Sequence, residues 1–119
     1  MQNISPNLLL LELAYKEANN KYVSSTLLQE YLNLAELDSK NKKKWYKKAI
    51  EVAKKHLRNF PLDKNKYLVL VDLGFAYFCL GKLKLASKNF KGALRIIPKH
   101  DQLMRKSLIL NLQKINLIK

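Results

Sequence analysis

The scarcity of turn-forming residues constrains the fold of this chain more than any other feature of its sequence. The 119 residues include only 3 Gly and 3 Pro, whereas Leu and Lys, both good helix formers, are the commonest residues. A β-sandwich or β-barrel needs many more turn residues, so these all-β classes are excluded. Since 48% of the residues are hydrophobic, the chain can form a core of its own. We predict one all-α domain over residues 1–119.

Hydrophobic periodicity divides this domain into six predicted helices. Ser5 and Pro6 are suited to begin the first helix, Asn19 and Asn20 to end it, and the Ser-Ser-Thr run 24–26 to cap the second. Pro61, Gly81 and Pro98 follow the third, fourth and fifth helices, and Asp101 caps the sixth. Short connections force sequential helices to pack as antiparallel αα-hairpins. The second helix is expected to follow its cap at residues 24–26 and to run to about residue 37, and the other expected ranges are residues 8–18, 44–58, 64–80, 83–97 and 101–118.

Small and apolar residues follow a fixed spacing through the 34 residues 67–100. The positions that carry the pattern are Leu70, Leu73, Gly74, Tyr77, Gly81, Ala86, Phe90, Ala93 and Pro98. This window resembles a tetratricopeptide repeat (TPR), with Leu70 in place of the usual Trp. Gly74 and Ala86 are small where two helices cross closely, and Pro98 ends the second helix. The resemblance implies a right-handed stack of antiparallel helix pairs.

Residues 25–61 form a weaker copy of the same pattern. The matching positions are Tyr31, Leu34, Ala35, Ala49, Ala53, His56 and Pro61. The turn inside this copy is about two residues longer, and His56 stands where a small residue is usual, which argues against a tight helix crossing. A repeat buries only the face that it shares with neighbours, so we expect capping helices in residues 1–24 and 101–119.

The titratable residues are too scattered to predict an enzyme. His56 and His100 stand 44 positions apart, with no Cys or third His at ligand spacing, so we interpret both as partly exposed imidazoles near helix ends. There is no Gly-rich loop after a strand and no Ser in a nucleophile elbow. Cys79, as the single cysteine, cannot form an intramolecular disulfide and fits a reducing compartment. We therefore predict no catalysis, no metal and no cofactor.

In TPR proteins the first helix of each pair lines a concave groove that receives a segment of a partner protein. The positions that the resemblance assigns to this groove are Leu68, Val71, Asp72, Phe75, Phe78 and Cys79. This surface is apolar with one acid, so it lacks the Lys, Asn and Arg clamp with which co-chaperone members hold an acidic terminus. The resemblance implies an apolar or amphipathic partner segment, with occupation of the groove by the chain's own helix as the alternative.

The expected last helix is apolar on more than one side. Its residues include Leu103, Met104, Leu108, Ile109, Leu110, Leu112, Ile115, Leu117 and Ile118. One side is expected to pack on the preceding helix. The other side is suited to a partner or to self-association with a second copy of the chain, unless it is buried elsewhere.

Positive charge is concentrated in the later part of the chain. Residues 1–38 hold two cations and five acids, whereas residues 39–119 hold 21 cations and four acids. Helical spacing predicts two basic stripes, and the helix stack that the TPR resemblance implies would set them side by side on its convex side, where an acidic protein, an anionic membrane surface or a nucleic-acid backbone could bind. Twenty of the 23 cations are Lys, which argues against base-specific contacts and also fits AT-rich codon usage without a binding role. The stripes comprise Lys44, Lys47, Lys48, Lys54, Lys55 and Arg58, then Lys84, Lys88, Lys91 and Arg95.

Trp45 and Tyr46 adjoin the first stripe, where they could stack on bases or belong to the hairpin core. Together these features predict a non-catalytic protein–protein interaction module, such as a scaffold, adaptor or assembly factor. Residues 73–78 are also similar to those of repeat proteins that assist photosystem assembly, which gives a more specific alternative. No signal peptide or membrane span is evident, so we expect a soluble protein of the cytoplasm or an organelle interior.

Overall fold

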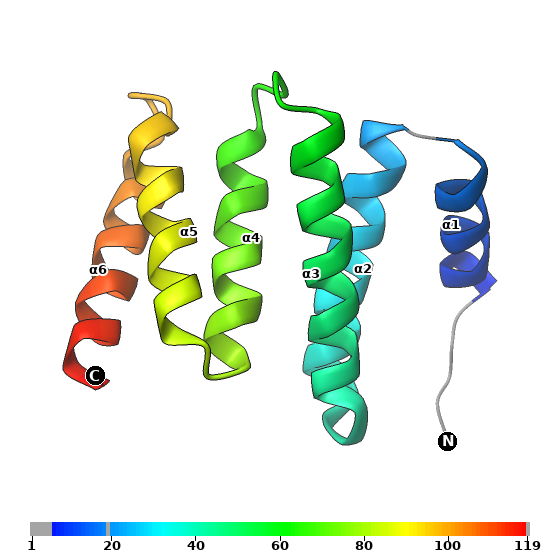
Figure 1. The fold of residues 1–119 in the computed structure, drawn as a ribbon, viewed down its shortest axis with the longest axis horizontal. Coiled ribbons are helices and arrows are strands. Elements are labelled where there is room, and N and C mark those ends of the chain that lie inside the picture. The colour runs from blue at the N-terminus through cyan, green and yellow to red at the C-terminus, as the bar shows by residue number, and fades with distance from the viewer. Residues whose placement is uncertain (1–5, 19, 119) are drawn as a thin grey trace. The chain divides into compact units, whose positions relative to one another are not determined.

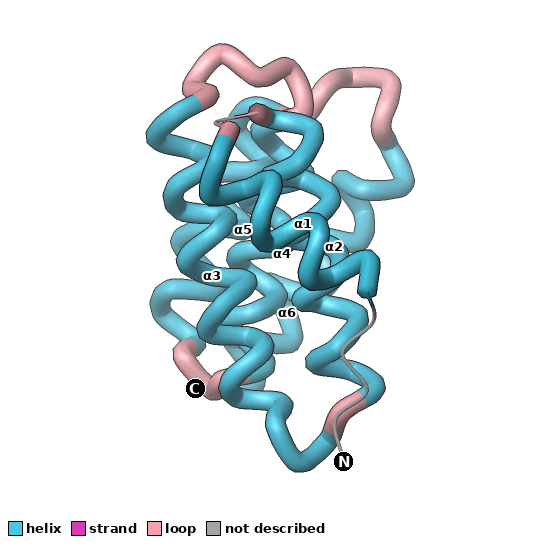
Figure 2. The backbone as a smooth tube through the Cα atoms, turned by 90° about the vertical axis from the view of Figure 1, so that its right-hand side faces the viewer, coloured by secondary structure: helices cyan, strands magenta, loops and turns pink. Residues whose placement is uncertain are grey.

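The computed structural model describes residues 6–18 and 20–118, which form α-helices, one short 3₁₀-helix and connecting loops, with no strand among these residues (Figure 2). The prediction of an all-α helical stack is therefore confirmed. Ser5 and Asn19, expected to flank the first helix, lie outside the described residues. The chain divides into two compact units, Met1–Pro61 and Leu62–Lys119. The division follows the residue that ends the weaker repeat copy.

The first unit consists of α1 (Pro6–Glu17), α2 (Lys21–Leu37), η1 (Ser39–Asn41) and α3 (Lys42–Asn59). Helices α2 and α3 form an antiparallel hairpin, and α1 packs beside α2 (Figure 1). The rings of Tyr31 and Trp45 stack across the hairpin with their centroids 5.9 Å apart. Burial of these large aromatic surfaces stabilises the crossing. The other buried apolar residues of the hairpin are Leu27, Leu28, Leu32, Ala35, Tyr46, Ala49, Val52 and Ala53.

Helix α2 begins at Lys21, earlier than the start predicted after a cap at residues 24–26. Asn20 is its N-cap, since the Asn20 side-chain oxygen accepts from the backbone amides of Tyr22 at 2.8 Å and Val23 at 3.3 Å. An Asn side chain satisfies amides that the first helical turn leaves without partners. Ser24 therefore lies inside the helix, where it is buried.

His56 is buried, which corrects its interpretation as a partly exposed imidazole. Only 1% of its surface is exposed, and its Nδ1 lies 2.9 Å from the Ser24 hydroxyl oxygen. Its ring also contacts the Phe60 ring, with the centroids 5.0 Å apart. The larger side chain is accommodated because α2 supplies a small hydroxyl residue opposite it, so a bulky residue at this repeat position still packs inside the hairpin.

The turn between α2 and α3 is held by Asp38. Its Oδ2 accepts hydrogen bonds from Trp45 Nε1 at 3.0 Å and from Asn41 Nδ2 at 3.0 Å. One carboxylate thus connects the turn to the buried indole, which would otherwise leave its N–H without a partner. The longer turn that the repeat comparison predicts is an ordered segment with its own 3₁₀ turn.

The second unit consists of α4 (Lys66–Cys79), α5 (Leu83–Ile96) and α6 (Gln102–Ile118), each antiparallel to the next in sequence (Figure 1). Helices α4 and α5 cross closely at Gly74, where a methyl group would lie 2.7 Å from Cδ1 of the buried Phe90 ring. Gly74 therefore leaves room for an aromatic ring. Gly81 adopts φ 77°, and the Lys82 amide donates to the Tyr77 carbonyl at 2.9 Å, which ends α4 in a Schellman-type cap.

Candidate functional site

The residues that the TPR resemblance assigns to a groove all lie outside the buried face of α4. Leu68 and Phe75 are exposed, and the other four, Val71, Asp72, Phe78 and Cys79, are partly exposed. The buried residues of α4 lie on other sides of the helix and are Tyr67, Val69, Leu73, Gly74, Ala76 and Tyr77. Since α5 packs on α4, the assigned residues are available to line a surface.

A hollow of about 300 Å³ adjoins this surface within the second unit. Phe75 and Phe78 of α4 and Phe90 of α5 supply its aromatic wall, and Asn111 and Lys114 of α6 supply polar groups. Of the six assigned groove residues, the hollow brings together only the two phenylalanines. Helix α6 contributes to the hollow without filling it. We name this site the phenylalanine hollow.

The first turn of α6 is tied to α4 by Asp101. The Asp101 Oδ1 atom caps α6 by accepting from the Met104 amide at 3.1 Å, and its Oδ2 atom accepts from the Tyr67 hydroxyl at 3.0 Å. Burial and this hydrogen bond raise the pKa of Tyr67 above its ordinary value. The two contacts fix the start of α6 beside the start of α4, and so help to position the two helices that contribute to the phenylalanine hollow.

Helix α6 also carries exposed apolar residues, as its sequence predicts. Leu108 and Ile115 are fully buried, whereas Leu103, Leu110 and Leu117 are 82%, 56% and 86% exposed. These three leucines recur every seven residues and therefore follow one side of the helix. Partner binding or self-association through this side stays a prediction.

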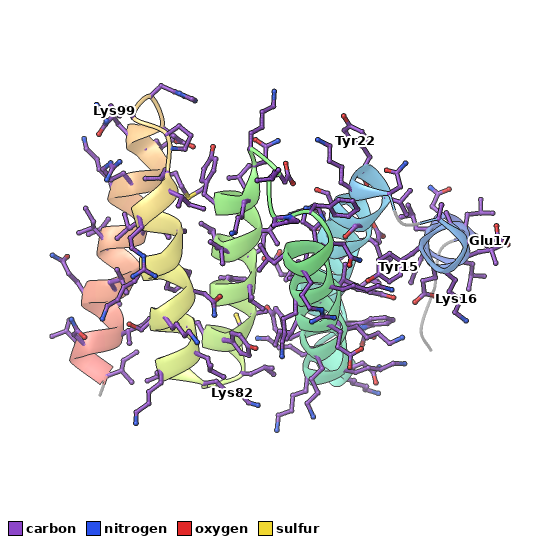
Figure 3. The ribbon with its side chains drawn as sticks, turned by 45° about the horizontal axis from the view of Figure 1, so that its top comes forward. Tyr15, Lys16, Glu17, Tyr22, Lys82 and Lys99 are labelled. Carbon is purple, nitrogen blue, oxygen red and sulfur yellow. The ribbon has the colours of Figure 1, made fainter. Side chains whose placement is uncertain are left out.

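A larger hollow, of about 490 Å³, lies within the first unit among α1, α2 and α3. Tyr15 of α1 lies on the side of its helix that faces α2 and α3, while Glu17 points away (Figure 3). Tyr31 of α2 and Val52 of α3 also border the space. The remaining lining residues are all on α3: Lys48, Glu51, Lys54, Lys55 and Arg58. We name this site the tyrosine–lysine hollow.

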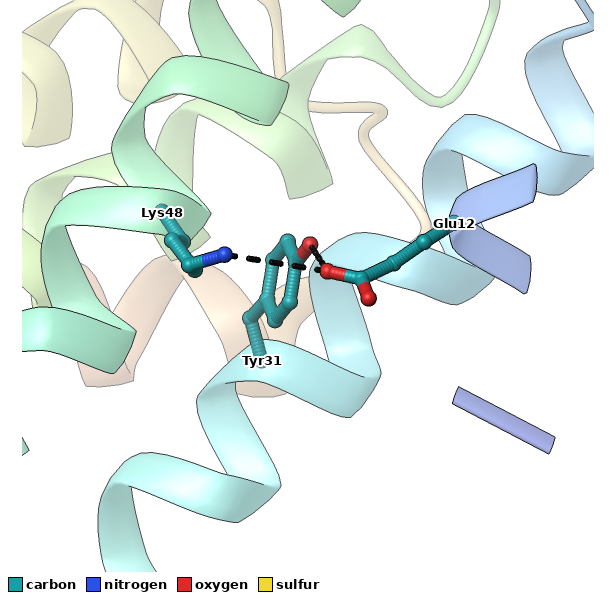
Figure 4. Close-up of polar contacts among 3 residues, drawn as sticks. All are labelled: Glu12, Tyr31 and Lys48. Atoms are coloured by element: carbon teal, nitrogen blue, oxygen red, sulfur yellow. Dashed lines mark hydrogen bonds and ion pairs between the residues drawn. The ribbon is translucent and has the colours of Figure 1, made fainter. Parts of the chain in front are cut away.

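A polar contact among three helices lies at one end of the tyrosine–lysine hollow, where Tyr31 and Lys48 line it (Figure 4). The Tyr31 hydroxyl donates to Glu12 Oε2, and Lys48 Nζ lies 3.7 Å from the same oxygen. Burial, followed by this bond to a carboxylate, raises the pKa of Tyr31 well above its ordinary value. Lys48 thus forms an ion pair with an acid of α1.

The other end of this hollow is richer in uncompensated positive charge. Lys55 Nζ lies 5.0 Å from the centroid of the Tyr15 ring, in the range of a cation–π contact. Burial raises the pKa of Tyr15, while the nearby Arg58 guanidinium acts in the opposite direction. In the part of the chain that the structure describes, no ion pair joins Lys54, Lys55 or Arg58 to an acid.

The predicted basic stripes fall on two separately described units. On α3, Lys48 is partly exposed, and Lys44, Lys47, Lys54, Lys55 and Arg58 are exposed. On α5, all four residues, Lys84, Lys88, Lys91 and Arg95, are exposed. Trp45 and Tyr46, beside the first stripe, are both 2% exposed and belong to the hairpin core. Neither aromatic ring is therefore available to stack on a base.

Sequence reasoning missed several residues that border the hollows. Tyr15 and Glu51 in the first unit, and Asn111 and Lys114 in the second, were not among the predicted site residues. Tyr15, Asn111 and Lys114 lie on α1 and α6, whose neighbours the repeat pattern does not specify, and Glu51 is an acid within the basic stripe that the sequence predicts on α3.

Among the described residues, no group of three His, Cys, Asp or Glu side chains is arranged to hold a metal ion. Within the same residues, no helix combines the length and apolar character needed to cross a membrane. Comparisons with family models, with curated proteins and with solved structures find no match for this chain. The two hollows and the charged surfaces are the features of the structure that bear on function.

Proposed function

We propose that this chain is a non-catalytic interaction module of the TPR type, which binds an apolar or amphipathic segment of a partner protein. The observation that carries the proposal is the phenylalanine hollow, where Phe75 and Phe78 border a space that α6 leaves open. The spacing of residues 67–100 and the antiparallel α4–α5 hairpin with Gly74 at its crossing support a TPR architecture.

The chemistry of the hollow indicates the kind of segment that fits. Three phenylalanine rings favour an apolar side chain, whose burial contributes roughly 25 cal/mol per Å² of apolar area. Lys114 offers one cation, and Asn111 offers both a donor and an acceptor. We therefore expect an apolar anchor with a carboxylate nearby, rather than a terminal carboxylate held by several cations.

A peptide selection tests this proposal with the intact chain. Peptides from a displayed random library are selected on the immobilised protein, and their affinities are then measured for the wild type and two variants. Phe75→Ala removes a wall of the hollow, whereas Leu85→Ala is the matched control, because the two side chains are 38% and 39% exposed but Leu85 does not line the hollow. Phe75→Ala is expected to weaken binding about tenfold or more, and Leu85→Ala less than about twofold.

Salt dependence separates this function from its main alternative. Affinity for the selected peptides should change less than about threefold between about 0.05 M and 0.5 M salt, since apolar burial is not screened. Equal losses for both alanine variants, or selected peptides without apolar anchors, would contradict the groove proposal.

Binding of an anionic macromolecule to the basic face is the second candidate. The four exposed cations of α5 recur at intervals of four, three and four residues, which aligns them on one side of that helix. Lys88→Glu with Lys91→Glu should weaken such binding steeply and leave peptide binding in the phenylalanine hollow unchanged. A loss of peptide binding in this double variant, with Phe75→Ala neutral, would favour the basic face.

A further inference from the structure

We propose that the tyrosine–lysine hollow binds an organic phosphomonoester. Its volume of about 490 Å³ lies in the range of small-molecule sites, about 300–1,000 Å³. The site lies wholly within the first unit and does not depend on the groove function proposed for the second. Its four cations belong to the basic stripe of α3, and an aromatic wall and an acid accompany them there, which the stripe of α5 lacks among its four residues.

The balance of charge in the hollow favours an anion. Four cations border the space, against the single carboxylate of Glu51. Lys48 already lies 3.7 Å from Glu12, whereas the other three cations have no ion pair with an acid in the described residues. A phosphomonoester carries a charge of about −1.5 to −2 at neutral pH, so it offsets most of this positive charge.

The three cations without an acidic partner in the described residues, Lys54, Lys55 and Arg58, are close enough along α3 to bind one phosphate group. Lys54 and Arg58 are four residues apart, which makes them neighbours on one side of α3. Lys55 lies over the Tyr15 ring at 5.0 Å, so Tyr15 and its hydroxyl belong to the same end of the hollow. A guanidinium fork, two ammonium groups and a phenol hydroxyl form a donor set that suits the three terminal oxygens of a phosphate ester.

The remainder of the hollow distinguishes an organic phosphate from a chain of phosphates. Tyr31 and Val52 give an apolar surface beside the cations, and Glu51 disfavours a second anionic group. A nucleic-acid backbone would place further phosphates near Glu51 and Glu12. An uncharged ring with a hydrogen-bond donor for Glu51 meets these requirements better.

Calorimetric titration of the intact chain with phenyl phosphate tests the site, with inorganic phosphate and phenol as the partial ligands. Phenyl phosphate is expected to bind at one site and about tenfold or more tightly than either partial ligand. Lys54→Gln with Arg58→Gln should weaken this binding about tenfold or more. Lys91→Gln with Arg95→Gln is the matched control, because it removes an exposed Lys and Arg at the same spacing on α5.

Thermal melting of both double variants checks that the fold is retained. Absence of phenyl phosphate binding, equal affinity for inorganic phosphate, or equal losses in both double variants would overturn the proposal. Tyr15→Phe gives a separate measurement, since loss of its hydroxyl should weaken phenyl phosphate binding and leave phenol binding unchanged.

Two further ligands identify the source of the phosphate. Adenosine monophosphate represents a free small molecule, and a phosphotyrosyl peptide represents a modified side chain of a partner. If one of these two ligands binds more tightly than the other, and its binding is lost in the double variant of Lys54 and Arg58, the result supports the site and identifies the class of its ligand. Tighter binding of single-stranded DNA than of both ligands, with equal losses in the control pair, would instead assign the affinity to general surface charge.

Discussion

The contact between Gly74 and Phe90 allows a quantitative test of how tightly α4 and α5 cross. A Cβ atom on Gly74 would lie 2.7 Å from both Cδ1 and Cε1 of the Phe90 ring. The Phe90 ring is 2% exposed, so a shift away from α4 would cost part of its packing in the core. Gly74→Ala is therefore expected to overpack the crossing.

Gly92 provides the matched control for this substitution. Both glycines lie inside helices of the same unit, but a Cβ atom on Gly92 would meet Leu70 Cδ1 at 3.7 Å, an ordinary contact distance. Replacing a helical Gly by Ala stabilises a helix by about 1 kcal/mol through its propensity alone. Gly92→Ala should gain most of this amount.

The net effect of Gly74→Ala combines the same gain with a larger cost. Overpacking a filled core costs about 1–3 kcal/mol, so the free energy of unfolding should change by about 0 to −2 kcal/mol. The two variants should thus differ by about 1–3 kcal/mol. Urea titration followed by circular dichroism measures this difference as a shift of the unfolding midpoint at constant slope.

A second substitution locates the cost at the aromatic ring. Phe90→Leu removes the ring atoms nearest to the added methyl group, so Gly74→Ala should be less costly in that background than in the wild type. The double-mutant cycle should give a coupling of about 1 kcal/mol or more. Equal stabilisation by Gly74→Ala and Gly92→Ala, or additive effects with Phe90→Leu, would refute the close crossing.

Three further predictions address the polar contacts of the fold. Because the pKa of Tyr31 is raised in the folded chain, the stabilising effect of this tyrosine is complete below about pH 10 and is lost at higher pH. The free energy of unfolding should therefore fall as the pH rises, and Tyr31→Phe should make this fall smaller by up to about 1.4 kcal/mol per pH unit. Urea titration from about pH 9 to 11 measures the difference. Ser24→Val removes the hydroxyl beside buried His56 and should destabilise the chain by about 1–3 kcal/mol, whereas an unchanged urea midpoint would show that this contact is dispensable. Asp101→Ala removes the cap of α6 and should lower stability by about 1–2 kcal/mol, with faster amide exchange in the first turn of α6 than in α5 as the check.

The fold was largely predictable because its signals are local. Gly81 has the positive φ that its place after α4 predicts, and Asp101 caps α6 as its position before an apolar run suggests. The predicted start of α2 was wrong because Asn20 and Ser24, only four residues apart, are both suited to cap a helix. Asn20 satisfies the first amides, while Ser24 is held inside the hairpin by His56 from α3. A contact with a residue 32 positions away therefore decides the role of Ser24, and sequence spacing alone does not show it.

Only some of the residues that border each hollow could be predicted from the sequence. The TPR resemblance assigns six residues of α4 to a groove, and all six lie outside the buried face of that helix. The resemblance does not identify Asn111 and Lys114, which border the phenylalanine hollow from α6. Their position depends on how α6 docks, and the contact of Asp101 with Tyr67 helps to fix that docking. Each hollow combines one wall that the sequence pattern predicts with another that tertiary packing adds.

The same distinction applies to the positive charge on α3. Lys48 and Lys55 are seven residues apart and therefore lie on one side of the helix, so the sequence alone does not distinguish them. Packing makes them different, because α1 brings Glu12 to Lys48 but places the Tyr15 ring beside Lys55. A paired cation attracts an external anion less than an unpaired one does, since the neighbouring carboxylate already offsets its field. The chemistry of this surface therefore depends on which lysines α1 leaves without an acid, and a count of positive residues along α3 does not reveal it.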